Sequence, residues 1–192
     1  MFFKTNFIFC SFILKWLQFT IILLMLSHGG VSYAAPKIAQ EYQVKAVFLY
    51  NFANFIRWPQ TAFANPRAPF NICILGHDPF RPEIDIAVEN EQVDRHVVKV
   101  KRLNSMVNVD RCQILFISQS EAANFTTILN FIHKRPILTV SEIDDFVTQG
   151  GMIQFFKYRK RIRFYIVPDT LKKSGLQASG NLLRVAKIVR HR

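Results

Sequence analysis

Two short apolar runs constrain the fold of this chain more than any other feature of its sequence. Phe70–Leu75 is almost continuously apolar and stops at Gly76, and Cys112–Ile117 repeats that pattern further along the chain. Strands that are buried on both faces have this composition, whereas strands with one solvated face alternate apolar and polar residues. Helices must then cover both faces of the sheet, which indicates an α/β protein.

Helices are predicted on either side of these runs. The first spans Glu41–Trp58, ends at Pro59, and has Val44, Val47, Phe48, Phe52, Phe55 and Ile56 on one apolar face. Further helices are predicted over residues 82–92, over 118–133 with Ser118 or Ser120 as its cap, over 141–146 with Ser141 as its cap, and over 179–191.

The remaining strands are predicted at 96–103, 136–140, 152–156 and 162–167. The first of these carries alternating basic residues and is expected near a sheet edge. The last two are separated by a short link, so they should form an antiparallel hairpin. The predicted fold is an α/β three-layer sandwich, with a mostly parallel Rossmann- or flavodoxin-like sheet and a C-terminal antiparallel hairpin.

The N-terminal segment has the pattern of a secretory signal peptide. Lys4 and Lys15 precede the apolar run Trp16–Leu26, and small residues end the segment. We expect cleavage after Ala34, which leaves a single domain over 35–192 in the periplasm. The alternative is an uncleaved anchor, for which the apolar run is short.

Removal of this segment changes both the charge and the cysteine count. The chain has 25 basic and 13 acidic residues, and loss of Lys4 and Lys15 lowers the formal charge from +12 to +10. Export makes nucleic acid an unsuitable anionic partner, so an acidic protein face, anionic lipid or a small anion remains. Cys10 is lost, and Cys73 and Cys112 remain either as a disulfide or as two buried thiols.

Several segments together resemble the YfiR-like family. They are Tyr42–Phe52 with Phe55–Pro59, Phe70–Gly76, Cys112–Ser118, Ile137–Ser141, Gly150–Ile153, Ile162–Ile166, Ser174–Leu176 and Leu182–Leu183. The resemblance implies a periplasmic, non-enzymatic regulator that binds and represses an inner-membrane diguanylate cyclase. It also implies a homodimer and redox sensitivity. Cys73 and Cys112 match one cysteine pair of the family, and a second pair is missing here.

A ligand-binding candidate lies at the expected carboxyl ends of the strands. It comprises Gly76, His77, Asp78, Ser118 and Ser141. Open α/β sheets bind ligands at such ends, so a small-ligand sensor or, as a further alternative, a hydrolase is possible there. Ordinary turn and cap chemistry explains the same residues. The sequence has no nucleophile elbow, zinc motif or phosphate loop, and we expect no cofactor and no metal.

Two surfaces are candidates for contact with a partner. Lys157, Arg159, Lys160, Arg161 and Arg163 make a basic hairpin, either a solvated turn or a contact with an acidic partner or peripheral lipid. Phe48, Tyr50, Phe52, Phe55 and Trp58 give the first helix more aromatic surface than one face must bury, which suggests an interface beside ordinary core packing. The last helix should carry Arg184, Lys187, Arg190 and His191 on its outer side.

Overall fold

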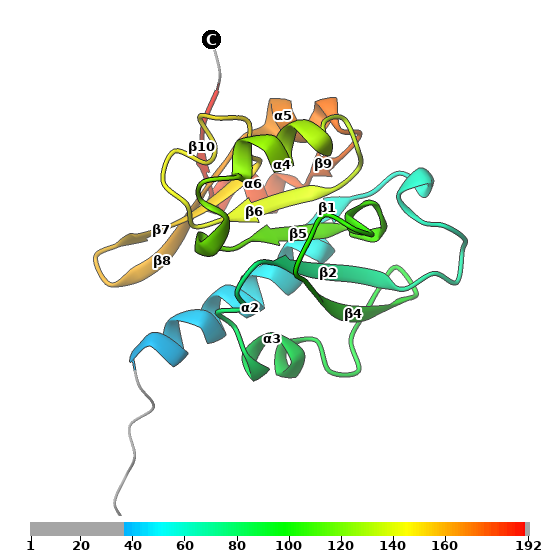
Figure 1. Ribbon diagram of the computed structural model, residues 1–192, viewed down its shortest axis with the longest axis horizontal. Helices are drawn as coiled ribbons and strands as arrows, with labels where there is room; N and C mark the ends of the chain where they lie inside the picture. The colour runs from blue at the N-terminus through cyan, green and yellow to red at the C-terminus, as the bar shows by residue number, and fades with distance from the viewer. Residues whose placement is uncertain (1–36, 191–192) are drawn as a thin grey trace, which may run out of the picture. The chain divides into compact units, whose positions relative to one another are not determined.

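The structure is a computed structural model that describes residues 37–190 (Figure 1). The predicted signal peptide, its cleavage after Ala34, and His191 of the predicted last helix lie outside the described residues. Within 37–190, no helix combines the length and the hydropathy that a membrane span requires.

The central sheet follows the order β10-β8-β7-β6-β5-β2-β4-β3 in the described residues. The strands from β4 to β7 are parallel, and β8 returns antiparallel to β7. If the five parallel strands β4-β2-β5-β6-β7 are renumbered by their order in the chain, their order across the sheet is 2-1-3-4-5, which is the flavodoxin arrangement. The bounds are β2 Phe70–Leu75, β3 Gln92–Val93, β4 His96–Leu103, β5 Ile114–Ile117, β6 Leu138–Ser141, β7 Ile153–Tyr158, β8 Arg161–Ile166 and β10 Lys187–Ile188.

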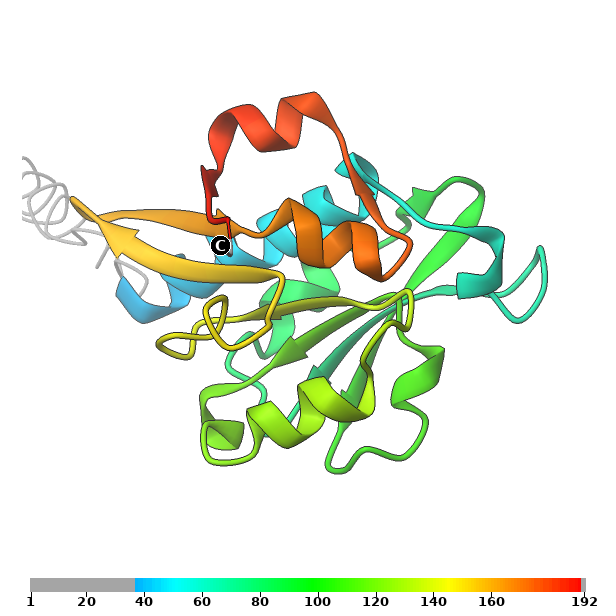
Figure 2. The same cartoon turned by 90° about the horizontal axis from the view of Figure 1, so that it is seen from above.

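This arrangement confirms the predicted fold class and the C-terminal hairpin. A separate two-stranded sheet pairs β1 with β9. The helices cover both faces of the central sheet, as Figure 2 shows from above. Their bounds are α2 Lys37–Phe55, α3 Pro82–Ala87, α4 Phe125–Phe131, α5 Pro168–Lys173 and α6 Gly180–Val185, and the two short strands are β1 Ile56–Arg57 and β9 Gln177–Ala178.

Strand β2 illustrates how the two faces are filled. Ile72 and Ile74 enter a core shared with α2, α3, α5 and α6, while Cys73 and Leu75 enter a second core beneath α4. All four side chains are buried, because successive residues of a strand point to opposite faces. A continuous apolar run is therefore required at this position, as the sequence predicts.

The first helix differs from its prediction in its bounds and in its buried face. It ends at Phe55 rather than Trp58, because Ile56 and Arg57 pair with β9. Val44 and Val47, predicted to face the core, are 45% and 47% exposed. The buried positions are Lys45, Ala46, Leu49, Phe52 and Ala53.

Two predicted helices are shorter than expected because short strands replace their ends. Helix α3 stops at Ala87, since Gln92–Val93 forms β3 and turns back onto β4. Helix α6 begins after Ser179, whose hydroxyl accepts a hydrogen bond from the Leu182 amide and so caps the helix. It stops at Val185, since Lys187–Ile188 pairs with β8, and the basic residues predicted beyond that point do not lie on a helix.

Two other helix predictions are wrong because serine hydroxyls bond elsewhere. Residues 118–133 contain a single 3-10 turn at Gln119–Glu121 and then α4, and neither Ser118 nor Ser120 caps them. Ser141 ends β6, residues 143–146 form a bend and a turn, and the Ser141 hydroxyl donates to the Ile117 carbonyl. Serine side chains compete with the backbone for hydrogen bonds, so a cap pattern alone does not fix a helix.

Candidate functional site

The crevice expected to hold a ligand lies where β2 and β5 end. Consecutive elements leave these neighbouring strands toward opposite faces, α3 with Ile84 to one core and α4 with Ile128 to the other. Such a switch point is the usual ligand position in open α/β sheets. The loops after β2 and β5 carry four of the predicted site residues, namely Gly76, His77, Asp78 and Ser118.

Those two loops are hydrogen-bonded directly to each other. The His77 amide donates to the Ser120 hydroxyl at 2.9 Å, and the Ser118 hydroxyl donates to the His77 carbonyl at 2.6 Å. Gly76 has a φ of +87°, and a Cβ there would lie 2.3 Å from the Ser120 Oγ. The loops therefore use these polar groups for contacts with each other.

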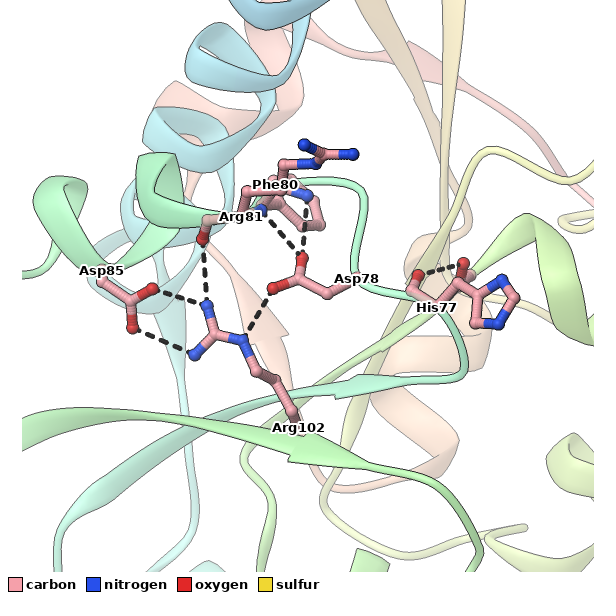
Figure 3. Close-up of polar contacts among 7 residues, drawn as sticks. His77, Asp78, Phe80, Arg81, Asp85 and Arg102 are labelled. Atoms are coloured by element: carbon pink, nitrogen blue, oxygen red, sulfur yellow. Dashed lines mark hydrogen bonds and ion pairs between the residues drawn. The ribbon is translucent and has the colours of Figure 1, made fainter.

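Asp78 points into a separate cluster around Arg102, shown in Figure 3. Its Oδ1 accepts hydrogen bonds from the amides of Phe80 and Arg81, and its Oδ2 accepts one from the Arg102 Nε at 2.7 Å. Arg102 also donates to both carboxylate oxygens of Asp85 and to the Arg81 carbonyl. Four of the five N–H groups of its guanidinium are bonded, and they hold β4 against the β2–α3 loop.

The charge state of this cluster follows from its contacts. The hydrogen bonds to Asp85 raise the pKa of Arg102 above its ordinary value, burial opposes that shift, and the bond to Asp78 adds to it. The His77 ring points away from the cluster (Figure 3). Asp78 and His77 are therefore adjacent in sequence but not directed toward a common point.

Ser141 serves the sheet rather than the crevice. It is fully buried, its hydroxyl donates to the Ile117 carbonyl at 2.7 Å, and it accepts from the Ile143 amide at 3.1 Å. The structure brings Gly76, His77 and Ser118 together and leaves Ser141 in the core. Ligand binding at this end stays a prediction.

Cys73 and Cys112 form a disulfide with a Cα–Cα distance of 5.9 Å. They are not opposite each other in the ladder, because Cys73 is in register with Leu115 and Cys112 precedes β5. Both side chains are buried in the core under α4, with 0% and 2% exposure. A reductant can reach them only when this part of the fold opens.

The five aromatic residues predicted as an interface lie mostly against the core. Phe52 is fully buried, and its ring is 5.0 Å from that of Phe164, so it does not contribute to a surface. Phe48, Tyr50 and Trp58 are partly buried and pack on the same core. Phe55, at 39% exposure, is the most accessible of the five.

The basic hairpin projects from the fold beside the start of α2 (Figures 1 and 2). All five of its predicted basic side chains are exposed: Lys157, Arg159, Lys160, Arg161 and Arg163. Arg159 and Lys160 form the turn with φ values of +46° and +64°, where Asn-Gly is the usual choice. Positive φ costs a residue with a Cβ about 1–2 kcal/mol, so the hairpin keeps two cations where glycine would be more stable.

A groove of ≈ 420 Å³ separates this hairpin from α2. Val44, Phe48 and Ile162 provide its apolar surface, and Lys157, Lys160 and Arg161 provide its basic border, with Gln40 and Glu41 completing the lining. Val44 was assigned to the core by helical periodicity. The sequence carries no signal that the helix is rotated from this prediction, because a lysine such as Lys45 is rarely buried unless it is paired.

A charge network fixes α2 beside the groove. The ammonium of Lys45, 4% exposed, contacts the carboxylates of Glu41 at 2.8 Å and of Glu142, and Tyr42 donates to Glu142 at 2.8 Å. Lys157 of the hairpin bonds to the other oxygen of Glu41. Burial raises the pKa of Glu41, but the hydrogen bonds from Lys157 and Lys45 outweigh it and hold that pKa below its ordinary value.

These features define a class of protein: a flavodoxin-like α/β domain whose switch-point loops are bonded to each other and whose basic hairpin is exposed. Within residues 37–190, His, Cys, Asp and Glu side chains do not gather in threes as a metal site requires. A family model described as YfiR/HmsC-like matches residues 42–187, and the chain belongs to this family. The resemblance inferred from its segments is thereby confirmed. A search of curated proteins gives no match to this chain.

Proposed function

We propose that this protein is a periplasmic, non-enzymatic regulator that binds and represses the sensor region of an inner-membrane diguanylate cyclase. Membership of the YfiR/HmsC-like family over residues 42–187 is the observation that carries the proposal. The family is consistent with periplasmic regulation of such cyclases. The N-terminal segment, with the pattern of a signal peptide, supports export to that compartment.

The arrangement of polar groups supports binding over catalysis. Catalysis needs a nucleophile, base or acid that faces a substrate, but Ser118 and Asp78 are bonded to the chain itself. On α2, the exposed apolar side chain of Val44 lies beside the exposed cations of the hairpin. Exposed apolar side chains bordered by charge are typical of surfaces that bind another protein.

Repression follows from preferential binding to one conformation of the cyclase. A regulator that binds the inactive state more tightly shifts the population toward that state by its difference in affinity. A tenfold difference corresponds to about 1.4 kcal/mol. Only contact with the sensor region is needed, so a single domain without a cofactor suffices.

Deletion of the gene, followed by measurement of cellular cyclic di-GMP, tests the proposal. We expect cyclic di-GMP and biofilm to rise, and re-expression of the exported chain to return both to their original level. Purification of the tagged protein from membranes should recover a diguanylate cyclase, identified by mass spectrometry. Unchanged cyclic di-GMP after deletion would rule out the proposed role.

A further inference from the structure

The hairpin offers a second feature beside the groove, which is a free strand edge. On its outer side β8 pairs with β10 only at Tyr165 and Ile166. Within the described residues, Arg161–Phe164 has no ladder partner on that side. Unpaired N–H and C=O groups on such an edge are a template for another extended segment.

The groove lies against the face of the hairpin that carries Ile162. Ile162 and Phe164 point toward α2, where the Phe164 ring is 5.6 Å from that of Phe48. Val44 and Phe48 continue this apolar surface on the helix, and Ile162 joins them in the lining. A segment that added to β8 would therefore place alternate side chains onto Val44 and Ile162.

The charges on the edge determine which segment fits. Neither Lys160 nor Arg161 has an ion-pair partner within residues 37–190, whereas Lys157 pairs with Glu41. A second copy of the chain would bring the same cations to the same edge, and like charges across strands are unfavourable. Carboxylates on the incoming segment would instead meet unpaired cations.

From these observations we propose that β8 and the adjoining groove bind an extended acidic segment of the partner protein, in which carboxylates alternate with apolar residues. This inference rests on the proposed function, because it names the surface through which the regulator holds its partner. Backbone hydrogen bonds to β8 supply part of the affinity. The apolar pocket and the cations supply the selectivity.

The binding probe is a fluorescein-labelled nonapeptide in which Glu alternates with Val, with a twin in which Lys replaces every Glu. The mature protein should bind the acidic peptide, and the Lys twin should not bind. Hydrogen exchange should slow at the amides of β8 when the acidic peptide is present, because strand addition occupies them. Unchanged exchange at β8 would overturn strand addition.

Two valines on α2 provide a matched pair of variants. Val44 lines the groove and Val47 does not, yet both are about half exposed on the same helix. Val44→Glu should weaken peptide binding at least about tenfold, because it opposes like charges in the site. Val47→Glu should leave binding unchanged. Equal effects of the two substitutions would contradict the assignment.

A charge-reversal pair distinguishes the groove from the overall basic character of the protein. Lys160→Glu with Arg161→Glu should abolish binding, while Lys172→Glu with Lys173→Glu on α5 changes the net charge equally and should retain it. Vesicles of phosphatidylglycerol in phosphatidylcholine provide the lipid comparison. Vesicle binding that is lost only in the groove variant, without peptide binding, would assign the surface to a membrane and overturn the proposal.

These results are separable from those that test the proposed function. If the peptide binds in the groove but gene deletion leaves cyclic di-GMP unchanged, the binding surface is supported and the repression of a diguanylate cyclase is rejected. Raised cyclic di-GMP with no peptide binding at β8 would retain the regulator and reject this surface.

Discussion

The switch point and the hairpin differ in how their polar groups are used. At the switch point, the His77 backbone is bonded to Ser118 and Ser120, and Arg102 is paired with Asp78 and Asp85. At the hairpin end, Lys160 and Arg161 extend into solvent beside exposed Val44. The switch point is the usual position of a ligand site but has few free polar groups. The hairpin has free polar groups but is not a usual position for a ligand.

This contrast separates residues that maintain the fold from residues that are available to a partner. Buried polar groups must be paired, and each unpaired one costs about 1–3 kcal/mol. Substitution at the switch point should therefore lower stability. Substitution on the hairpin should leave stability unchanged and affect association.

Loss of the disulfide beneath the switch point should have the largest effect. Cys73→Ala with Cys112→Ala opens a loop that spans a sequence separation of 39 residues. On the chain-entropy model this lowers the free energy of unfolding by about 4 kcal/mol. Urea denaturation of the variant and of the wild type, with and without reductant, measures this loss of free energy of unfolding. An identical midpoint in all samples would contradict the prediction.

Gly76→Ala should lower the free energy of unfolding by about 2 kcal/mol. Position 76 has a positive φ, and the added Cβ would lie too close to the Ser120 hydroxyl. Thermal denaturation measures the loss. Gly180→Ala is the matched control, since nothing lies within 4 Å of a Cβ there. Adding Ser120→Ala to Gly76→Ala should cost less than the sum of the two single changes. Strict additivity would mean that the loops do not contact as described.

Arg102→Met should lower the free energy of unfolding by about 1 kcal/mol, because it leaves Asp78 and Asp85 without their shared cation. Arg163→Met on the hairpin removes an equal charge from an exposed position and should leave stability unchanged. Urea denaturation at low ionic strength compares the two. A larger loss for Arg163→Met would reverse the proposed division of roles.

The smallest effect should come from Glu41, and it should depend on pH. Its folded-state pKa lies below the ordinary value of 4.5, so its ionised form stabilises the fold above that value. The contribution is lost as pH falls through the lowered pKa. Glu41→Gln should therefore cost about 0.5 kcal/mol at neutral pH, and less in acid as the carboxylate becomes protonated. If urea denaturation gives the same loss of free energy of unfolding at neutral and at acid pH, the prediction is contradicted.

Local patterns predicted the strands better than the helices. The bounds of β2 and β4 agree with those predicted from the sequence. The continuous apolar run of β2 is typical of a strand buried on both faces, and the alternation of basic and apolar residues in β4 is typical of a strand with one solvated face. Strands β3 and β10 were missed, since two-residue strands exist only through pairing with distant residues. Ser118, Ser120 and Ser141 were expected to cap helices, but their hydroxyls bond to loops and strands that sequence spacing does not reveal.

The candidate site shows the same limit. The hairpin cations were predicted, because a dense basic cluster between two strands must lie at the surface. The position of Val44 beside that hairpin was not predicted. It depends on the rotation of α2, which is set by the contact of Lys45 with Glu142, nearly a hundred residues away. The sequence also placed the polar residues correctly at the switch point. It could not show that those residues satisfy one another.

Complementation of the gene deletion tests the central claim most directly, with cellular cyclic di-GMP as the measurement. His77→Ala removes only an exposed ring and keeps the backbone bonds of the crevice, whereas Val44→Glu alters the groove. We predict that the wild type and His77→Ala return cyclic di-GMP to its original level and that Val44→Glu does not. Full complementation by Val44→Glu, together with failure of His77→Ala, would contradict the account.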